Sequence, residues 1–355
     1  MSAPRILLLS HSHAFGPFRV GSHHYARTLA ESGADVVHLS TPVSAAHRVT
    51  GRIDRATLAT LPRGPVRDAA GVTHLVPRTL VPVPYGRFRV DRALRRHGIA
   101  ERFDAVLIDQ PLLWHDSVRS LTERLVYRPT DMYPDGVKHG LQERIIAAAD
   151  GVLATSSAVL DALGDLRVPT LVIENGVDAD RFAAPQGNGV REALCVYVGA
   201  LDGRFDWEQL GAWGRGHPDV RFVVAGPGAA PAVLPSNVEM LGAIAYDQLP
   251  ALLHRARVGL LPLSDDPLNE GRSPMKLYEY LAAGTAVVTR ETPVLHADAE
   301  SGVYTYRDTG DADAALRSAL AHPSPNAAGV RRAAYEGWGA KTAQLQRFAL
   351  GLAPR

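Results

Sequence analysis

The most informative stretch of this chain is Asn269-Glu-Gly-Arg-Ser-Pro-Met-Lys-Leu-Tyr-Glu-Tyr-Leu-Ala-Ala-Gly-Thr-Ala-Val-Val288, which predicts a loop, a helix and a buried strand in succession. Ser273 is a favourable N-cap and Pro274 suits the first helical position. Met275 to Ala283 are mostly good helix formers. Gly284 can adopt the left-handed conformation that ends a helix, and the apolar residues that follow fit a buried strand. The stretch therefore predicts one α/β unit.

The start of this predicted helix has the chemistry of an anion site. The backbone N–H groups between Ser273 and Lys276, including that of Met275, have no partner within the helix and point out of its end. Arg272 and Lys276 add positive charge there. Glu279 shares a helix face with Lys276 because the two are three residues apart. We expect a nucleotide diphosphate here, with its phosphates at the helix tip and its ribose over Glu279. An ordinary amphipathic helix packed on a sheet is the alternative.

The same residues resemble the donor-binding signature of GT-B glycosyltransferases of the family 4 type. Those enzymes carry two glutamates before an Ala-x-Gly-x-Pro-Val stop. Glu279 matches the second glutamate, whereas the first falls at Gly271, and Glu270 is one residue out of register. Pro-Met-Lys-Leu-Tyr-Glu-Tyr-Leu-Ala-Ala-Gly is similar to the bacterial teichuronic acid and xanthan glucuronosyltransferase type.

A second segment, Glu174-Asn-Gly-Val-Asp-Ala-Asp-Arg-Phe182, is similar to the Pro-Asn-Gly-Val-Asp-x-x-x-Phe stretch of GT-B enzymes, with Glu174 in place of the proline. The resemblance implies an α/β protein of GT-B architecture, with two Rossmann-like domains facing a central cleft. It further implies a hexosyltransferase of carbohydrate biosynthesis that uses a nucleotide-sugar donor, such as a UDP-sugar.

Composition narrows the class of protein. A chain of 355 residues is long enough for two domains, and its 46% hydrophobic and 21% charged residues are normal for a globular protein. The formal net charge of +1 argues against a nucleic-acid binder. Cys195 is the single cysteine, which excludes an intramolecular disulfide, and we expect it to be buried. The sequence contains no apolar run long enough to span a membrane and no secretory signal, so we expect a cytoplasmic protein.

Short apolar runs alternate with helical stretches, which is typical of parallel α/β units. We expect an N-terminal acceptor-binding domain over residues 1–185, a donor-binding domain over 186–335, and a final helix over 336–355 that crosses back to the first domain. The linker is expected at 183–191, which is rich in small and polar residues. Residues 41–72 show too weak a pattern to assign. The expected strands are 5–10, 34–39, 105–109, 124–127, 151–154, 170–173, 194–198, 220–225, 238–241, 258–261, 286–289 and 303–306, and the expected helices are 22–32, 112–121, 140–149, 157–164 and 326–349.

Positions at other expected strand ends extend the predicted donor site, because ligands of parallel sheets bind beyond the carboxyl ends of the strands. Gly199 follows the first strand of the second half and should border the diphosphate. Arg204 is a candidate phosphate ligand in the same loop. Gly242 follows another strand and should lie along the nucleobase. Asp265, Asp266 and Asn269 precede the donor helix and are candidates for contacts with sugar hydroxyls.

The loop His11-Ser-His-Ala-Phe-Gly-Pro-Phe-Arg-Val-Gly21 follows the first strand but lacks the Gly-x-Gly-x-x-Gly turn, which argues against a nicotinamide dehydrogenase. It suits an acceptor cleft, with Gly16 approaching the sugar and Arg19 contacting a phosphate or an acidic sugar. A solvated Arg19 is the alternative. The histidines of this region lack the carboxylate or cysteine partners of a zinc site, and we expect His13 and His23 to line the cleft.

The reaction requires activation of the acceptor hydroxyl. Asp131 lies in a loop after an expected strand and is the candidate general base of an inverting enzyme, with Asp135 as its rival. Asp131 as a turn-capping residue is the alternative, and a retaining enzyme would need no such base. Two Asp-x-Asp strings, at Asp178 and Asp311, are interpreted as chance. Because Arg272 and Lys276 neutralise the diphosphate, we expect no metal and no other cofactor.

Several alternatives stay open. A nucleotide-sugar 2-epimerase of the same fold would turn over without an acceptor, and a non-catalytic sugar-nucleotide binding subunit would bind the donor without turnover. The acceptor is expected to be a small molecule or a glycan, lipid-linked in some relatives. Arginines among apolar residues at 78–96 (Arg78, Arg87, Arg89, Arg92, Arg95 and Arg96) fit either weak peripheral membrane contact or a solvated helix face.

Overall fold

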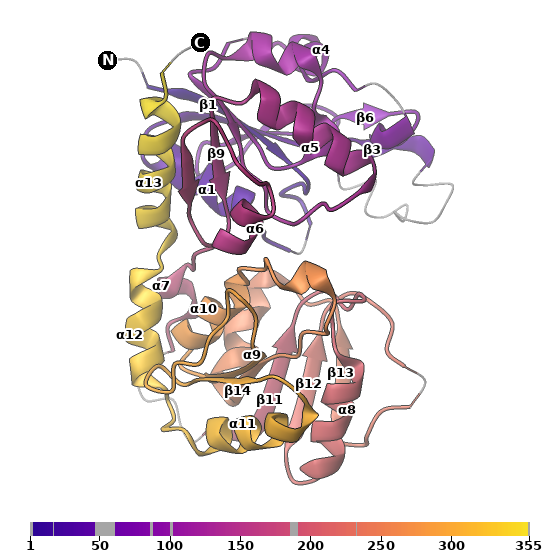
Figure 1. Cartoon of the computed structure of the whole chain (residues 1–355), viewed down its shortest axis with the longest axis vertical. Helices are drawn as coiled ribbons and strands as arrows, with labels where there is room; N and C mark the ends of the chain where they lie inside the picture. Colours follow the sequence, from indigo (N-terminus) through magenta and orange to yellow (C-terminus); the bar gives the residue numbers. More distant parts are fainter. Residues whose placement is uncertain are drawn as a thin grey trace. The chain divides into compact units, whose positions relative to one another are not determined.

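The computed structural model describes residues 3–16, 18–46, 61–85, 88–99, 102–184, 191–231 and 233–353. The chain divides into two compact units (Figure 1): an N-terminal unit of residues 1–173 and 341–355, and a C-terminal unit of residues 174–340. The chain passes between the units at residues 173–174, ahead of the expected linker at 183–191, whose residues 185–190 lie outside the described part. The last residues of the chain group with the N-terminal unit.

The N-terminal unit is built on one sheet with the strand order β10-β9-β8-β7-β1-β2-β5-β4. All neighbouring strands are parallel except β4 and β5. The order of strands reverses between β1 and β7, and a binding crevice forms at such a reversal, beyond the carboxyl ends of the strands. The strands are β1 (Arg5–Ser10), β2 (Asp35–Ser40), β4 (Val66–Arg67), β5 (Thr73–Leu75), β7 (Ala105–Ile108), β8 (Leu125–Tyr127), β9 (Gly151–Ala154) and β10 (Thr170–Val172), with β3 (Val43–Ser44) and β6 (Arg78–Thr79) forming a separate pair.

Helices of this unit follow the predicted pattern with one correction. The helix predicted at 112–121 is wrong, because two separate 3-10 turns, η2 and η3, occupy this stretch. His115 has extended backbone dihedrals between them, and its Nδ1 accepts a hydrogen bond from the Ser117 N–H at 3.0 Å. That local bond starts a new turn in place of a continuous helix. The helical elements are α1 (Gly21–Glu31), η1 (Val83–Tyr85), α4 (Val90–Arg96), η2 (Pro111–Leu113), η3 (Asp116–Leu121), α5 (Gly136–Ala148), α6 (Ser157–Asp161) and α13 (Trp338–Gly351).

The C-terminal unit has an all-parallel sheet of order β13-β12-β11-β14-β15-β16, which reverses between β11 and β14. This is the order 3-2-1-4-5-6 of a dinucleotide-binding fold. Its strands are β11 (Glu192–Val198), β12 (Arg221–Ala225), β13 (Val238–Gly242), β14 (Ala256–Leu261), β15 (Ala286–Arg290) and β16 (Val303–Tyr306). Its helical elements are α7 (Ala179–Phe182), α8 (Trp207–Gly216), η4 (Tyr246–Gln248), α9 (Leu249–Arg255), η5 (Pro267–Asn269), α10 (Met275–Ala282), α11 (Thr309–Ala321) and α12 (Ala327–Tyr335).

Both faces of the C-terminal sheet are buried. Val196 and Val198 of β11 belong to one apolar cluster with residues of α9, α10 and α12, whereas Cys195 and Tyr197 belong to another with residues of α8 and α11. Alternate residues of a strand point to opposite faces, which explains why the strand is apolar throughout. Cys195 is buried as predicted.

The segment 326–349 is helical as predicted, but it forms two helices, because α12 ends at Tyr335 and α13 begins at Trp338. Val177, distant in sequence, inserts its backbone at this break: its N–H donates to the Glu336 carbonyl at 2.9 Å, and its carbonyl accepts from the Trp338 N–H at 3.2 Å. These two hydrogen bonds take the place of the helical hydrogen bonds that a continuous helix would make around Gly337.

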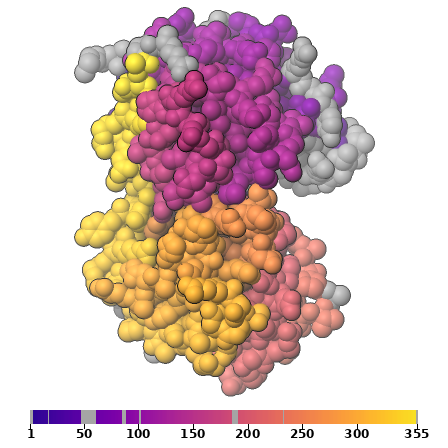
Figure 2. Space-filling view, viewed as in Figure 1, coloured from indigo at the N-terminus to yellow at the C-terminus, as the bar shows by residue number. Residues whose placement is uncertain are grey.

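The end of α13 packs closely on the N-terminal unit (Figure 2). A Cβ added at Gly151 would lie 2.9 Å from the Phe348 ring and 3.0 Å from Leu352, so a larger residue would force these side chains to shift. Arg124 donates from Nε to the Leu352 carbonyl at 3.0 Å. The absence of a side chain at the start of β9 thus permits the C-terminal helix to dock.

Three buried imidazoles, contributed by α1, β2 and β5, contact one another edge to face inside the N-terminal unit, and we refer to this row as the histidine stack. The rings of His23 and His38 are 5.0 Å apart, and those of His38 and His74 are 5.2 Å apart. The His74 Nε2 atom lies 2.9 Å from a carboxylate oxygen of Asp68. Burial lowers the pKa of His23 to about 3 and lowers the pKa of His38 well below its ordinary value.

We expect this stack to make the N-terminal unit sensitive to acid. The pKa values of His23 and His38 are depressed in the folded state, so below about pH 6.5 the unfolded chain binds more protons. As the pH falls below this value, the free energy of unfolding decreases by up to about 1.4 kcal/mol per group for each pH unit. His38→Gln should flatten the fall of the urea unfolding midpoint between about pH 7 and about pH 5.

The control variant is His296→Gln, which removes an exposed imidazole. It should keep the wild-type pH slope. The stack would not be the acid-sensitive element if His38→Gln showed the wild-type slope as well.

Candidate functional site

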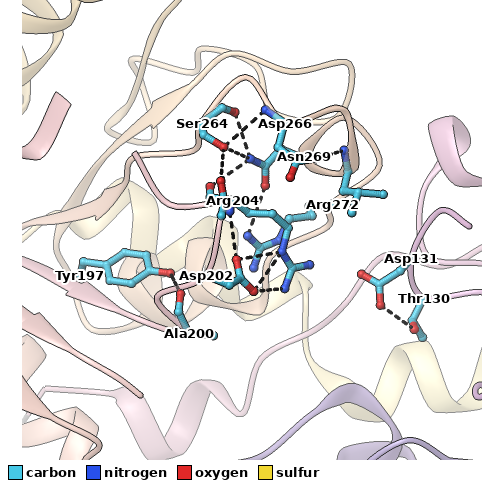
Figure 3. A network of polar contacts seen from close by, with 12 residues as sticks. Thr130, Asp131, Tyr197, Ala200, Asp202, Arg204, Ser264, Asp266, Asn269 and Arg272 are labelled. Carbon is cyan, nitrogen blue, oxygen red and sulfur yellow. Dashed lines mark hydrogen bonds and ion pairs between the residues drawn. The ribbon is translucent and has the colours of Figure 1, made fainter. Parts of the chain in front are cut away.

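Two loops meet where the strand order of the C-terminal sheet reverses (Figure 3). The loop after β11 contains Gly203 and Arg204, and the loop after β14 contains Ser264. The Ser264 N–H donates to the Arg204 carbonyl at 3.0 Å, and the Ser264 hydroxyl donates to the Gly203 carbonyl at 2.9 Å. The buried Asn269 amide donates to the carbonyls of both Arg204 and Ser264, each at 3.0 Å. These bonds make the two loops one rigid edge.

Asn269 is predicted to contact sugar hydroxyls, but its side chain is already engaged in hydrogen bonds within the protein. Its Nδ2 is engaged by the two carbonyls, and its Oδ1 accepts from Arg272 Nη1 at 3.3 Å. Asp266 accepts from the Leu268 N–H at 2.9 Å and begins η5. The polar residues before α10 thus shape the approach of the chain to this helix.

The predicted phosphate ligand Arg204 is paired with a carboxylate. Its guanidinium donates to both oxygens of Asp202, at 3.1 Å and 3.2 Å from Nε and at 2.7 Å from Nη2 (Figure 3). This pairing lowers the pKa of Asp202 below its usual value. Arg204 is consequently held in place, but part of its charge is already neutralised.

The start of α10 differs from the prediction by one residue. Pro274 is the N-cap and no side chain caps the helix, so the prediction of Ser273 as N-cap is wrong. The Ser273 hydroxyl instead accepts from the Asn175 N–H at 3.1 Å, and the Ser273 carbonyl accepts from the Asn175 side chain at 2.6 Å. Asn175 therefore fixes the helix start, and the N–H groups of the first turn, at Met275 and Lys276, have no side-chain cap.

Lys276 and Glu279 lie together one turn into α10. Burial lowers the pKa of the Lys276 ammonium, and Glu279 opposes this shift. The Glu279 carboxylate is almost fully buried and accepts from the Tyr246 hydroxyl at 3.2 Å. Burial raises the pKa of Glu279, while Lys276 and the Tyr246 bond oppose the change. The predicted shared face of these two side chains is thus present at the helix start.

Glycines bring the surrounding backbones close to this helix. A Cβ added at Gly199 would lie 2.5 Å from the Tyr197 hydroxyl and 3.3 Å from the Lys276 side chain, which places Gly199 beside Lys276. A Cβ added at Gly226 would lie 1.6 Å from the Gly199 carbonyl. Gly242 has a positive φ of 68°, and its carbonyl accepts from the Gly226 N–H at 2.8 Å. The predicted glycines Gly199 and Gly242 therefore belong to one edge of the sheet.

The N-terminal unit carries a polar group that the sequence did not reveal. Asp109 and Arg128 directly follow β7 and β8, and the Arg128 guanidinium donates to the Asp109 carboxylate. Both side chains are 1% exposed, and Arg128 also lies 4.7 Å above the centre of the Tyr25 ring. Burial raises the pKa of Asp109, which Arg128 opposes. The only sequence signal was that each residue ends an apolar run.

Asp131 and His11 lie near this buried pair. His11 is within electrostatic reach of the carboxylates of Asp109 and Asp131 and of the Arg128 guanidinium. Thr130 donates to the Asp131 carboxylate at 3.5 Å (Figure 3). The predicted base, Asp131, is thus grouped with an imidazole and with the buried ion pair at the carboxyl edge of the N-terminal sheet.

The remaining cleft candidates lie in or after the loop that follows β1. Arg19 donates from Nη1 to the carbonyls of Gly16 and Phe18, at 2.9 Å and 3.2 Å, so it folds over its own loop. A Cβ at Gly16 would lie 3.5 Å from the half-buried His13 ring. Both ring nitrogens of His23 contact backbone: Nδ1 accepts from the Val20 N–H at 3.2 Å, and Nε2 is 3.1 Å from the Ser12 carbonyl. This geometry favours a structural role for His23.

The acidic strings considered for metals contribute to helix starts and ion pairs. Asp311 accepts from the Arg307 N–H at 3.0 Å, Asp313 lies 2.6 Å from His217, and Asp178 lies 3.8 Å from Arg181. Among the described residues, no group of three or more His, Cys, Asp or Glu is arranged to hold a metal ion.

Nor does any described helix have both the length and the apolar character needed to cross a membrane.

Comparisons with known proteins agree with this geometry. Residues 207–341 match the family model described as "Glycosyl transferase-like". The chain is 26% identical over 181 residues to the teichuronic acid biosynthesis glycosyltransferase TuaH of Bacillus subtilis, covering 46% of each chain. It is 30% identical over 223 residues to glycogen synthase of Mycobacterium tuberculosis, covering 55% of this chain and 50% of that protein. The chain thus spans about half the length of these curated relatives.

The solved structure of HepE from Anabaena, determined in complex with UDP and glucose, superposes with a TM-score of 0.64 at 16% identity, over 97% of this chain and 99% of that one. The fold is GT-B. The predicted fold class and the resemblance to GT-B glycosyltransferases are confirmed, and the family match and the curated relatives both indicate a glycosyltransferase.

The close approach at Gly199 can be tested by stability. Gly199→Ala places a methyl group against the Tyr197 hydroxyl and Lys276, and we expect it to cost about 1–3 kcal/mol of unfolding free energy, as overpacking does. Gly203→Ala is the matched control in the same loop, because nothing lies within 4 Å of its added Cβ. It should stay within about 0.5 kcal/mol of wild type by urea denaturation. Equal stability of the two variants would contradict the packing described for Gly199.

Proposed function

We propose that this protein is a glycosyltransferase that moves a sugar from a nucleotide-diphosphate sugar to the hydroxyl of a small molecule or glycan. The observation that carries the proposal is the uncapped start of α10, with Lys276 and Glu279 beside it, at the strand reversal between β11 and β14. UDP is the favoured nucleotide because the HepE structure holds UDP and glucose.

In this proposal the C-terminal unit binds the donor. The diphosphate accepts from the N–H groups of Met275 and Lys276, and the Lys276 ammonium and Arg272 balance its charge. The ribose hydroxyls donate to Glu279, whose carboxylate is oriented by the Tyr246 hydroxyl. Gly199 and Gly242 allow the donor to approach the backbone, and Arg204 borders the phosphates. These basic groups remove the need for a metal ion.

The N-terminal unit activates the acceptor. The Asp131 carboxylate takes the proton of the acceptor hydroxyl, and that oxygen attacks the anomeric carbon as the nucleoside diphosphate leaves. Direct displacement of this kind inverts the anomeric configuration. His11 is the second candidate for the base, since it is grouped with Asp109 and Asp131. His13, Gly16 and Arg19 are assigned to the acceptor side.

Donor binding depends in this scheme on two side chains of α10. Lys276→Ala and Glu279→Ala should each weaken UDP binding by about 1.5–3 kcal/mol, the usual loss for a hydrogen bond to a charged group. Arg331→Ala removes one positive charge from an exposed position on α12 and is the control. Isothermal titration calorimetry should show wild-type affinity for the control alone. Wild-type UDP affinity in both α10 variants, with an intact fold, would rule out this donor site.

Acceptor activation can be tested separately from donor binding. Asp131→Asn keeps the shape of the side chain but removes its basicity, so turnover should fall by about 10²–10⁴-fold while UDP affinity stays near wild type. Product stereochemistry, followed by NMR, should show inversion. Near-normal turnover or a retained configuration would remove Asp131 from the mechanism. His11→Gln, examined in parallel, shows whether the imidazole is the base.

The same assays separate the alternatives. A 2-epimerase would convert the nucleotide sugar without any acceptor, whereas a glycosyltransferase requires one. A non-catalytic binding subunit would bind UDP through Lys276 and Glu279 and show no turnover, and Asp131→Asn would then change nothing.

A further inference from the structure

The N-terminal unit contains a cavity of about 580 Å³ that the proposed reaction does not use. It lies between α4 on one side and the segment around β6 on the other. Its volume is in the range of sites that hold small molecules or head groups. The described residues that line it include five arginines and one histidine but no aspartate or glutamate.

Among the described residues, four of these five arginines have no carboxylate partner. Arg89 is neutralised by the buried Asp91, with two hydrogen bonds of 2.8 Å, and Arg78 donates to the Leu61 carbonyl at 2.9 Å. The other three, Arg63, Arg92 and Arg96, make no hydrogen bond or ion pair to any residue that the structure describes. Among the described residues, Asp91 is thus the one carboxylate that pairs with an arginine of the cavity lining.

The spacing of these charges follows one face of α4. Arg92 and Arg96 are four residues apart, so they line the same side of the helix, and Arg89 is the extended N-cap residue just before it. Like charges at this spacing repel and destabilise a helix. A bound anion would remove that repulsion. By contrast, Arg95 of the same helix is paired with Asp91 at 3.0 Å and does not line the cavity.

One part of the cavity wall is apolar. Val76, Val83 and Phe88 line it, and Val81 at its edge is 48% exposed, next to Leu80 at 83%. An inorganic anion alone would leave this wall unused. The cavity therefore suits a ligand with a charged end and an apolar or weakly polar body.

We propose that this cavity, named here the α4 pocket, binds a phosphate- or diphosphate-bearing ligand. Planar guanidinium groups recognise phosphate oxygens in pairs, and several unpaired guanidinium groups favour an anion of multiple charge. The phosphate group lies against Arg92, Arg96 and Arg63, and the body of the ligand lies against the valines and Phe88. The site is separate in sequence from the α10 donor site and does not depend on the proposed transferase activity.

The test measures binding of inorganic pyrophosphate to the full chain by titration calorimetry, in a Lys276→Ala background so that the proposed donor site does not contribute. Arg92→Gln combined with Arg96→Gln should weaken pyrophosphate binding about tenfold or more. The matched control is Arg102→Gln with Arg144→Gln, which removes two exposed charges from the same unit outside the cavity. The control should bind as the background protein does.

A second arm identifies the source of the phosphate. Sedimentation with phosphatidylcholine vesicles containing phosphatidic acid should be lost in the Arg92/Arg96 variant, but not in the control, if the ligand is a lipid head group. Pyrophosphate binding without vesicle binding supports a soluble phosphate ester. Each result supports the α4 pocket.

The proposal is overturned if neither probe binds, or if the Arg92/Arg96 variant and the control bind both probes equally. Loss of folding does not confuse the result, because removing the repulsion within α4 should maintain or raise the melting temperature. Melting curves recorded for each variant check this point.

Discussion

The buried amide of Asn269 is the contact on which the candidate donor site depends. It joins the loop after β11 to the loop after β14 through the carbonyls of Arg204 and Ser264, and it also holds Arg272. A buried amide without these partners would cost free energy, so the arrangement is strongly specified. Together with Asn175, which holds Ser273, this side chain sets the approach of the chain to α10 and the position of its first N–H groups.

The parallel direction of the strands constrains the carboxyl edge of both sheets in the same way. Parallel strands place all their following loops on one edge, and the reversal of strand order separates neighbouring loops enough to admit a ligand. In the C-terminal unit the edge carries Lys276 and Glu279. In the N-terminal unit it carries Asp109, Arg128 and the region of His11 and Asp131. Each unit therefore places polar side chains at the carboxyl edge of its sheet, where the backbone geometry leaves space.

The sequence was sufficient for features set by local pattern. Apolar runs predicted nearly every long strand, and Gly284 ends α10 with a positive φ of 76° as expected. The shared face of Lys276 and Glu279 followed from helical spacing alone. These predictions succeeded because each depends on residues within one or two turns of one another.

Features set by distant partners could not be predicted in this way. Ser273 failed as the N-cap because Asn175, 98 residues earlier, occupies its hydroxyl. The final helix is broken because Val177 pairs with the backbone at Gly337. Propensity favours a cap or a continuous helix at these places, but a hydrogen bond from a remote segment is worth as much as the local preference and decides the outcome.

The Asp109–Arg128 ion pair likewise could not be predicted from local sequence. Its members come from two different strand ends, and nothing in either local sequence indicates the partner. A fully buried ion pair is weak evidence for stability, because desolvation offsets the attraction between the charges. The pair therefore needs a reason other than folding energy. Its proximity to His11 and Asp131 supplies one, since a fixed charge at this edge sets the electrostatic environment in which either group would accept a proton.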